Sequence, residues 1–154
     1  LINAAALAKV ESHLSDAIAK GATLAIGVKR HSLCGTFFEP TVVTGMNKNM
    51  VVFHEETFGP IAPLFEFETE NEAVELANDT EFGLAGYFYS NDIRRVWRVA
   101  ERLETGMVGS NTGLISTEVA PFGGVKQSGQ GREGSKYGAD DSLELKYMCF
   151  GVIS

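Results

Sequence analysis

Short segments with the periodicity of strands alternate along this chain with segments whose apolar residues recur at helical spacing. Apolar residues at three- and four-residue steps predict a first helix that is capped by Asn3 and ends near Lys20 and Gly21. Thr69 and Glu72 form a capping box that predicts a second helix. Because strands and helices alternate, the sequence favours an α/β fold with a largely parallel sheet.

The same patterns place the remaining elements. Strands are expected at 23–28, 61–67, 83–89 and 107–110. The first and third of these should be buried. A third helix should follow a cap at Ser90, with Ile93 and Trp97 on its apolar face. Residues 111–134 are rich in glycine and lack periodicity, which indicates an ordered loop, and the alternation at 142–149 predicts a final extended strand.

The composition describes an acidic globular protein. The formal net charge is −7 at pH 7, so a nucleic acid or an anionic membrane surface would be repelled. No apolar run approaches the roughly 20 residues that span a bilayer. Cys34 and Cys149 are too few for a disulfide framework, which favours a reducing, cytoplasmic location. The first residue is Leu1 rather than methionine, so we expect a longer protein whose targeting signal, if present, lies outside this chain.

The hexapeptide EETFGP at residues 55–60 has the chemistry of a ligand-binding turn. A carboxylate accepts paired hydrogen bonds from ribose hydroxyls, and an aromatic ring offers a face to a flat heterocycle. The carboxylate pair Glu55 and Glu56 and the ring of Phe58 are therefore candidate binding groups. The alternative is a solvated acidic turn with Phe58 packed in the core.

A second motif, PFGGVKQSG at residues 121–129, has enough glycine for its backbone to approach a ligand closely. Phe122 is either an exposed ring on a constrained loop or a plug in the core. The following glycines lack the spacing of a phosphate-binding loop. They instead suggest a turn into a short helix that carries Arg132 and Glu133, whose side chains could also form a weak surface ion pair.

These two motifs, at this separation, resemble the C-terminal third of an NAD(P)-dependent aldehyde dehydrogenase. The resemblance implies that residues 1–140 are part of the catalytic domain and that residues 141–154 form an oligomerisation strand and tail. It also implies NAD or NADP as cofactor, an aldehyde as substrate, and a homodimer or homotetramer. The family's nucleophilic cysteine and general base lie upstream of this segment, so the 154 residues alone are expected to be inactive.

The resemblance assigns roles to particular residues. Glu56 corresponds to the glutamate that holds the nicotinamide ribose, and Phe58 to the aromatic residue that lines the site. Phe122 corresponds to a wall of the substrate tunnel. Glu133 corresponds to a glutamate that supports the general base by ordering water and relaying protons.

Within the family, residues 111–116, 134–138 and 143–147 look most like succinate-semialdehyde dehydrogenase. In that enzyme a serine at the position of Ser116 hydrogen-bonds the distal carboxylate of the substrate. Two alternatives stay open. One is a dehydrogenase for another carboxylated aldehyde, such as glutarate semialdehyde. The other is a non-catalytic assembly module that pairs its terminal strand with a partner.

The cysteines and histidines give no sign of a catalytic or metal site. The surroundings of Cys34 do not resemble the family's nucleophile motif, and Cys149 lies among apolar residues, where a cysteine acts as a small hydrophobe. His13, His31 and His54 lack the spacing of metal ligands. We therefore expect surface or capping roles for all three histidines.

Overall fold

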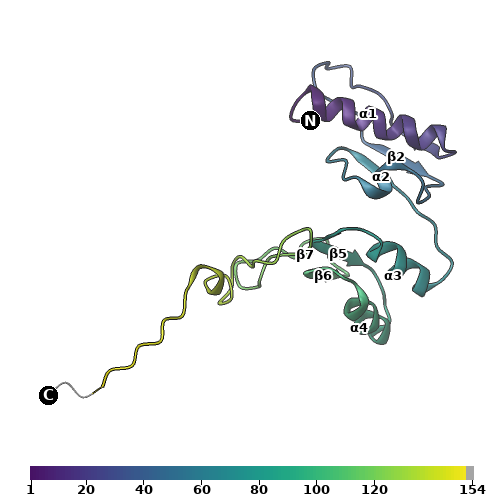
Figure 1. The fold of residues 1–154 in the computed structure, drawn as a ribbon. Coiled ribbons are helices and arrows are strands. Elements are labelled where there is room, and N and C mark those ends of the chain that lie inside the picture. The colour runs from purple at the N-terminus through teal and green to yellow at the C-terminus, as the bar shows by residue number, and fades with distance from the viewer. Residues whose placement is uncertain (152–154) are drawn as a thin grey trace. The chain divides into compact units, whose positions relative to one another are not determined.

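A computed structural model describes residues 1–151 of the chain. The chain divides into two compact units, Leu1–Glu70 and the part from Asn71 onward, and each has its own small sheets (Figure 1). The expected α/β class is thus confirmed. Strands pair in parallel in two places and antiparallel in two others, so the expectation of a largely parallel sheet is met only in part.

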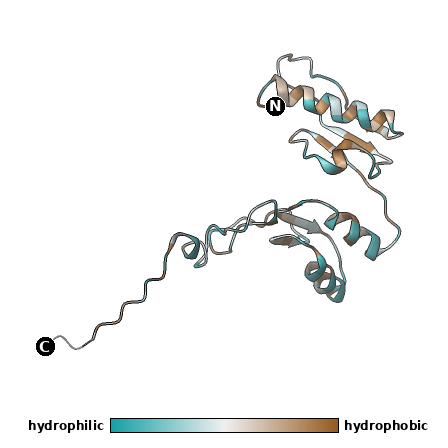
Figure 2. Cartoon of the chain, viewed as in Figure 1, coloured by the Kyte–Doolittle hydropathy of each residue, from teal (hydrophilic) through white to brown (hydrophobic). Residues whose placement is uncertain are grey.

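Helix α1 (Ala4–Ala19) opens the first unit as the sequence predicts. The Asn3 side chain accepts a hydrogen bond of 2.8 Å from the Ala6 backbone N–H, which satisfies a donor at the helix start. Gly21 adopts a φ of +96°, the left-handed conformation that commonly ends a helix. In Figure 2 α1 alternates between brown and teal along its length, as expected for a helix with one apolar face.

A three-stranded sheet packs against this helix. Its strands are β1 (Thr23–Ile26), β2 (Thr41–Thr44) and β3 (Ile61–Pro63), in the spatial order β1-β2-β3. Strand β2 runs antiparallel to β1 and parallel to β3. The core lies between the apolar face of α1 and the central strand, and its buried residues are Val10, Leu14, Ala17, Ala22, Val43, Met46 and Met50.

The short helix α2 (Val51–His54) is attached to α1 through one carboxylate. Asp16 accepts a hydrogen bond of 2.7 Å from the Val51 backbone N–H and forms an ion pair of 2.6 Å with Lys20. The hydrogen bond from Lys20, and then the one from Val51, hold the pKa of Asp16 below its ordinary value. This contact lies at the first residue of α2 and therefore fixes where that helix begins.

The second unit contains two pairs of strands and two helices. In chain order its elements are α3 (Glu70–Asn78), β4 (Phe82–Gly83), β5 (Ala85–Phe88), α4 (Ile93–Arg102), β6 (Met107–Ser110), β7 (Val125–Lys126) and η1 (Asp140–Ser142). Strands β5 and β6 pair in parallel, and β4 pairs with β7 antiparallel. The β4–β7 pairing attaches the glycine-rich loop to the rest of this unit.

Glycines allow the backbone of this unit to pack more closely than any side chain would permit. A Cβ atom on Gly106 would overlap the carbonyl oxygen of Gly123. A Cβ atom on Gly123 would in turn overlap the carbonyl oxygen of Gly131. Three backbone segments therefore stack directly on one another, and the positions of Phe122 and Glu133 depend on that stacking.

Several expectations about the strands were wrong, in bounds or in burial. Strand β1 is exposed throughout, because it lies at the edge of its sheet. The strand expected at 61–67 ends at Pro63. The strand expected at 83–89 is two short strands, and Tyr87 and Tyr89 are 50% and 72% exposed.

The helix cap and the apolar face expected for α4 also differ from the structure. Asp92, rather than Ser90, caps the helix by accepting a hydrogen bond from the Arg94 backbone N–H. Ile93 and Trp97 are exposed, and Val99 is the buried residue of α4. Helical periodicity identified an apolar stripe with Ile93 and Trp97, but the buried side of α4 is the one that carries Val99.

Residues 143–151 contain no strand, so the expected pairing of 142–149 is absent within the described part of the chain. Leu145 and Tyr147 are almost fully exposed, and Ser142 belongs instead to η1. An extended segment needs a neighbouring edge before its backbone groups can form a ladder. No helix among the described residues is long and apolar enough to cross a membrane.

We expect Gly123→Ala to destabilise the full-length protein that carries this chain. The new methyl group would overlap the Gly131 carbonyl and force two backbone segments apart, at a cost of about 1–3 kcal/mol. Gly113→Ala is the matched control, since the nearest atom to its added Cβ would be the Tyr89 hydroxyl at 4.0 Å. The urea concentration at the midpoint of unfolding should fall for Gly123→Ala and stay unchanged for Gly113→Ala. Equal midpoints would contradict the proposed close packing.

Candidate functional site

The first group of candidate residues lies on the loop between α2 and β3. Phe58 has a φ of +46° and its side chain is 80% exposed, so it is not the core residue that one interpretation of the sequence allowed. Glu56 is exposed, and its carboxylate has no hydrogen bond or ion pair within the described chain. The loop thus presents a free carboxylate and an aromatic ring to solvent.

The residues on either side of Glu56 are attached to α1. His13 is 3% exposed, and its Nδ1 lies 2.9 Å from the Thr57 hydroxyl oxygen. One Glu55 carboxylate oxygen lies 3.6 Å from His13 Nε2 and 3.6 Å from Lys9 Nζ. The expectation that His13 has a surface or capping role was therefore wrong. Its position on the apolar face of α1, at a helical step from Val10, was the sequence signal of burial.

The second group of candidate residues lies in the second unit, where the glycine-rich loop folds back on itself. Phe122 and Glu133 form an isolated antiparallel bridge, with backbone N–H to carbonyl distances of 2.8 Å and 2.7 Å. The short helix expected around Glu133 is absent, because these backbone groups are used in the bridge. Phe122 is half-buried, and the Glu133 side chain is exposed.

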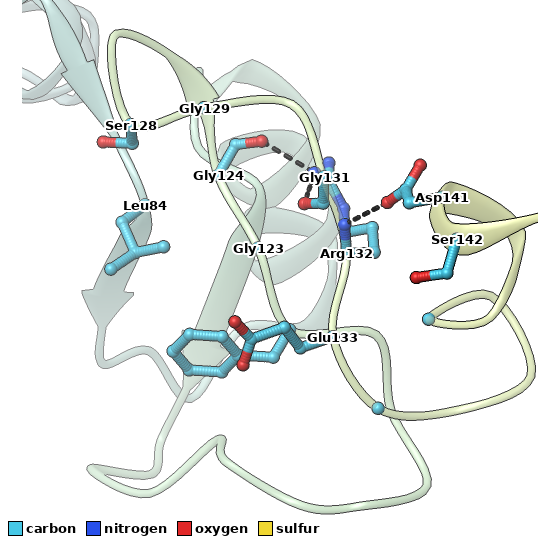
Figure 3. Close-up of a pocket in the computed structure, with 13 residues that line it drawn as sticks. Leu84, Gly123, Gly124, Ser128, Gly129, Gly131, Arg132, Glu133, Asp141 and Ser142 are labelled. Atoms are coloured by element: carbon cyan, nitrogen blue, oxygen red, sulfur yellow. Dashed lines mark hydrogen bonds between the residues drawn. The ribbon is translucent and has the colours of Figure 1, made fainter.

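Phe122 and Glu133 both line a pocket of about 550 Å³. In the close-up, Leu84 and Ser128 lie at one side of this pocket, and Asp141 and Ser142 lie at the other (Figure 3). Glycines form much of the wall: Gly123, Gly124, Gly129, Gly131, Gly134 and Gly138. The pocket combines one aromatic ring, one aliphatic side chain and two carboxylates.

Arg132 holds the wall of the pocket together. Its Nη1 donates hydrogen bonds to the carbonyl oxygens of Gly124 and Gly131, at 2.8 and 2.9 Å (Figure 3). The same atom donates to the Gln130 carbonyl oxygen at 3.0 Å. Its backbone N–H donates to the Asp141 carboxylate at 2.7 Å. Arg132 therefore forms no surface ion pair with Glu133 and ties the loop to itself and to η1. This bonding leaves the neighbouring Glu133 carboxylate free to face the pocket.

Ser116 lies on the exposed part of the loop after β6. The start of this loop is fixed by Asn111, whose side chain accepts from the Ser90 backbone N–H and donates to the Ser90 carbonyl, both at 2.8 Å. Ser116 is not among the residues that line the pocket of Phe122 and Glu133. The structure thus brings Phe122 and Glu133 together, and Glu56 and Phe58 together, and it places Ser116 in neither group.

Neither a metal centre nor a disulfide is formed by the described residues. No group of three or more histidine, cysteine, aspartate or glutamate side chains could hold a metal ion in the part of the chain that the structure covers. Cys34 and Cys149 are both free and exposed.

A family model for the aldehyde dehydrogenase family matches residues 1–148. The chain belongs to the aldehyde dehydrogenase family. The match spans both units and includes every candidate residue described above.

Curated relatives with related activities are similar over the whole chain. Glutarate-semialdehyde dehydrogenase of Pseudomonas aeruginosa is 62% identical over 153 residues, 99% of this chain and 32% of that protein. 3-Sulfolactaldehyde dehydrogenase of Pseudomonas putida is 64% identical, with the same coverage. The mitochondrial succinate-semialdehyde dehydrogenase of Arabidopsis thaliana is 61% identical over 154 residues, 100% of this chain and 29% of that protein. The chain therefore spans about a third of the length of the curated relatives that it matches.

Solved structures agree with this assignment. The succinate-semialdehyde dehydrogenase of Burkholderia pseudomallei has a TM-score of 0.95 and 69% identity, over 99% of this chain and 32% of that one. An NADP-dependent enzyme of E. coli has a TM-score of 0.95 and 58% identity, with the same coverage.

Proposed function

We propose that this chain is part of an NAD(P)-dependent dehydrogenase that oxidises succinate semialdehyde to succinate. The observation that carries the proposal is the similarity to succinate-semialdehyde dehydrogenase of Burkholderia pseudomallei, at 69% identity and a TM-score of 0.95. The names of the curated relatives support a semialdehyde substrate with an anionic end. The catalytic nucleophile and general base belong to the remaining two thirds of such an enzyme.

The loop that carries Glu56 and Phe58 fits a nicotinamide dinucleotide. Its free carboxylate is able to accept hydrogen bonds from both ribose hydroxyls, and its exposed ring offers an apolar face to the nicotinamide. When bound, the cofactor accepts the hydride that leaves the substrate. Glu56 holds the ribose, and Phe58 limits where the nicotinamide can lie. The similarity to an NADP-dependent enzyme supports NADP as well as NAD.

Phe122 and Ser116 are proposed to select the substrate. The Phe122 ring, on a loop that Arg132 and the glycines hold in place, forms one wall for the aldehyde chain. Ser116 has an exposed hydroxyl that can donate to the far carboxylate of the substrate. Glu133, free of ion pairs beside this wall, is proposed to order water and relay protons for the general base.

Glutarate semialdehyde is the second candidate substrate, because the relative from Pseudomonas aeruginosa that is named for it is 62% identical. The two aldehydes differ by one methylene group, so the same carboxylate contact would serve both. A hydrophobic tunnel discriminates a single methylene by only about 1–3 kcal/mol, and activity on both is expected.

The segment from Leu143 onward is proposed to join a homo-oligomer, as a dimer or tetramer. Its support is the row of exposed large side chains Leu143, Leu145, Tyr147 and Phe150 on a segment without a ladder partner. Such a segment is stabilised when it pairs with a sheet edge of another copy. The two free, exposed thiols support a reducing compartment such as the cytoplasm.

In the full-length enzyme, Glu56→Gln should slow hydride transfer more than it weakens cofactor binding. The amide has one acceptor oxygen where the carboxylate has two, so the paired hydrogen bonds from the two ribose hydroxyls are lost. A misplacement of the nicotinamide by ~1 Å can cost about 100-fold in rate. Single-turnover formation of NAD(P)H measures the first effect, and cofactor titration measures the second. An unchanged single-turnover rate would remove Glu56 from the site.

Ser116→Ala should lower kcat/KM for succinate semialdehyde by about 10- to 100-fold. A hydrogen bond to a charged group contributes roughly 1.5–3 kcal/mol, and the alanine variant loses it. A neutral aldehyde of the same length is the control substrate, because it has no carboxylate for the hydroxyl to hold. The ratio of the two kcat/KM values is the decisive measurement. Equal losses on both substrates would mean that Ser116 only shapes its loop.

Deleting the chain from Leu143 onward should shift the full-length enzyme to smaller species in sedimentation velocity. Leu145→Asp is a milder variant that keeps the chain length and places a charge in the proposed interface, at a residue that is fully exposed here. It should weaken association with no change in secondary structure by circular dichroism. Retention of the native oligomer by both variants would exclude this segment as the interface.

A further inference from the structure

We propose that His13, a residue outside the cofactor loop, positions Glu56 and Phe58 for the nicotinamide. This inference rests on the proposed function, because it adds a residue to the same cofactor site. His13 itself is buried. Its effect would pass through the two loop residues that it touches.

The first contact is a hydrogen bond inside the protein. His13 is 3% exposed, and its Nδ1 lies 2.9 Å from the Thr57 hydroxyl oxygen, across 44 residues of sequence. A buried polar side chain loses its hydration and needs a partner in the protein. Thr57 is that partner, so the imidazole holds the residue between Glu56 and Phe58.

The second contact lies on the other side of Phe58. Gly59 packs so tightly on Val10 that a Cβ atom there would overlap the Val10 Cγ2 atom. Val10 is fully buried, and it lies one helical turn before His13 on the same face of α1. The two neighbours of Phe58 are therefore both held by one face of one helix.

These two contacts account for the unusual backbone of Phe58. A bulky residue rarely adopts a positive φ, and it keeps one only where the surrounding structure holds it there. Thr57 and Gly59 are fixed against α1, and Phe58 between them has a φ of +46° with its ring 80% exposed. The ring is directed outward because both of its neighbours are held inward.

The same helix decides which of the two adjacent glutamates is available to a ligand. Lys9 Nζ and His13 Nε2 each lie 3.6 Å from one carboxylate oxygen of Glu55. Glu55 is thereby directed toward α1. Glu56, the next residue, has no such contact among the described residues and keeps its carboxylate free.

The test measures single-turnover NAD(P)H formation in the full-length enzyme with His13→Leu, which keeps an apolar volume and removes the contacts of His13 with Thr57 and Glu55. The rate should fall about tenfold, because a displaced Glu56 holds the ribose less well. In a Glu56→Gln background, His13→Leu should change the rate less than about threefold, since residues that act through one another are not additive. His13→Asn can keep a polar atom near the position of Nδ1, and it should restore most of the rate.

Two further variants separate positioning from general stability. Thr57→Val removes the hydrogen bond between His13 and Thr57 from the loop side. If His13→Leu does not fold, the single-turnover rate of Thr57→Val takes its place, and that rate should also fall. Leu14→Ala, a neighbouring core change on α1, should lower the melting temperature and leave the single-turnover rate close to wild type. A similar rate loss in Leu14→Ala would overturn the positioning role.

The outcomes distinguish this inference from the proposed function. If Glu56→Gln slows the reaction and both His13→Leu and Thr57→Val do not, the inference fails and the cofactor site stands. If His13→Leu slows the reaction by the same factor in both backgrounds, His13 does not act through Glu56. If Glu56→Gln has no effect, the cofactor site and the inference fail together.

Discussion

The burial of one face of α1 is the constraint on which the first unit depends. Val10 and Leu14 pack with Val43, Met46 and Met50, and apolar burial of this kind is the main favourable term in folding. The same face also carries His13, so the helix that forms the core holds the loop beside it. The core and the loop at residues 55–60 are therefore both held by a single helix, and the Phe58 ring is exposed on that loop.

The second unit depends on close backbone contact more than on side-chain burial. Val74 and Val99 are the buried apolar residues of its helices, whereas the stacked glycines and the guanidinium of Arg132 organise the loop around Phe122. The exposed large apolar residues of α4 are Ile93 and Trp97.

Local sequence signals predicted the elements whose stabilising contacts are local. The Asn3 cap, the periodicity of α1 and the start of α3 next to Thr69 depend on neighbours within one or two turns, and these predictions agree with the structure. The cap of α4 was harder to place because Ser90 and Asp92 are both good caps. The Ser90 hydroxyl accepts from the Asp92 backbone N–H, and the Asp92 carboxylate accepts from the Arg94 backbone N–H, so the helix begins after Asp92.

The sequence by itself determined the α/β class, the bounds of α1, the start of α3 and the family, because periodicity, capping residues and two distinctive motifs are all local features. It also located the candidate residues Glu56, Phe58, Ser116, Phe122 and Glu133, although their roles stay predictions. Only the tertiary structure decided that His13 is buried against Thr57 and that Glu55 rather than Glu56 is engaged by α1. It alone decided that Phe122 and Glu133 share one bridge. These facts depend on contacts between residues far apart in the chain, which local patterns do not specify.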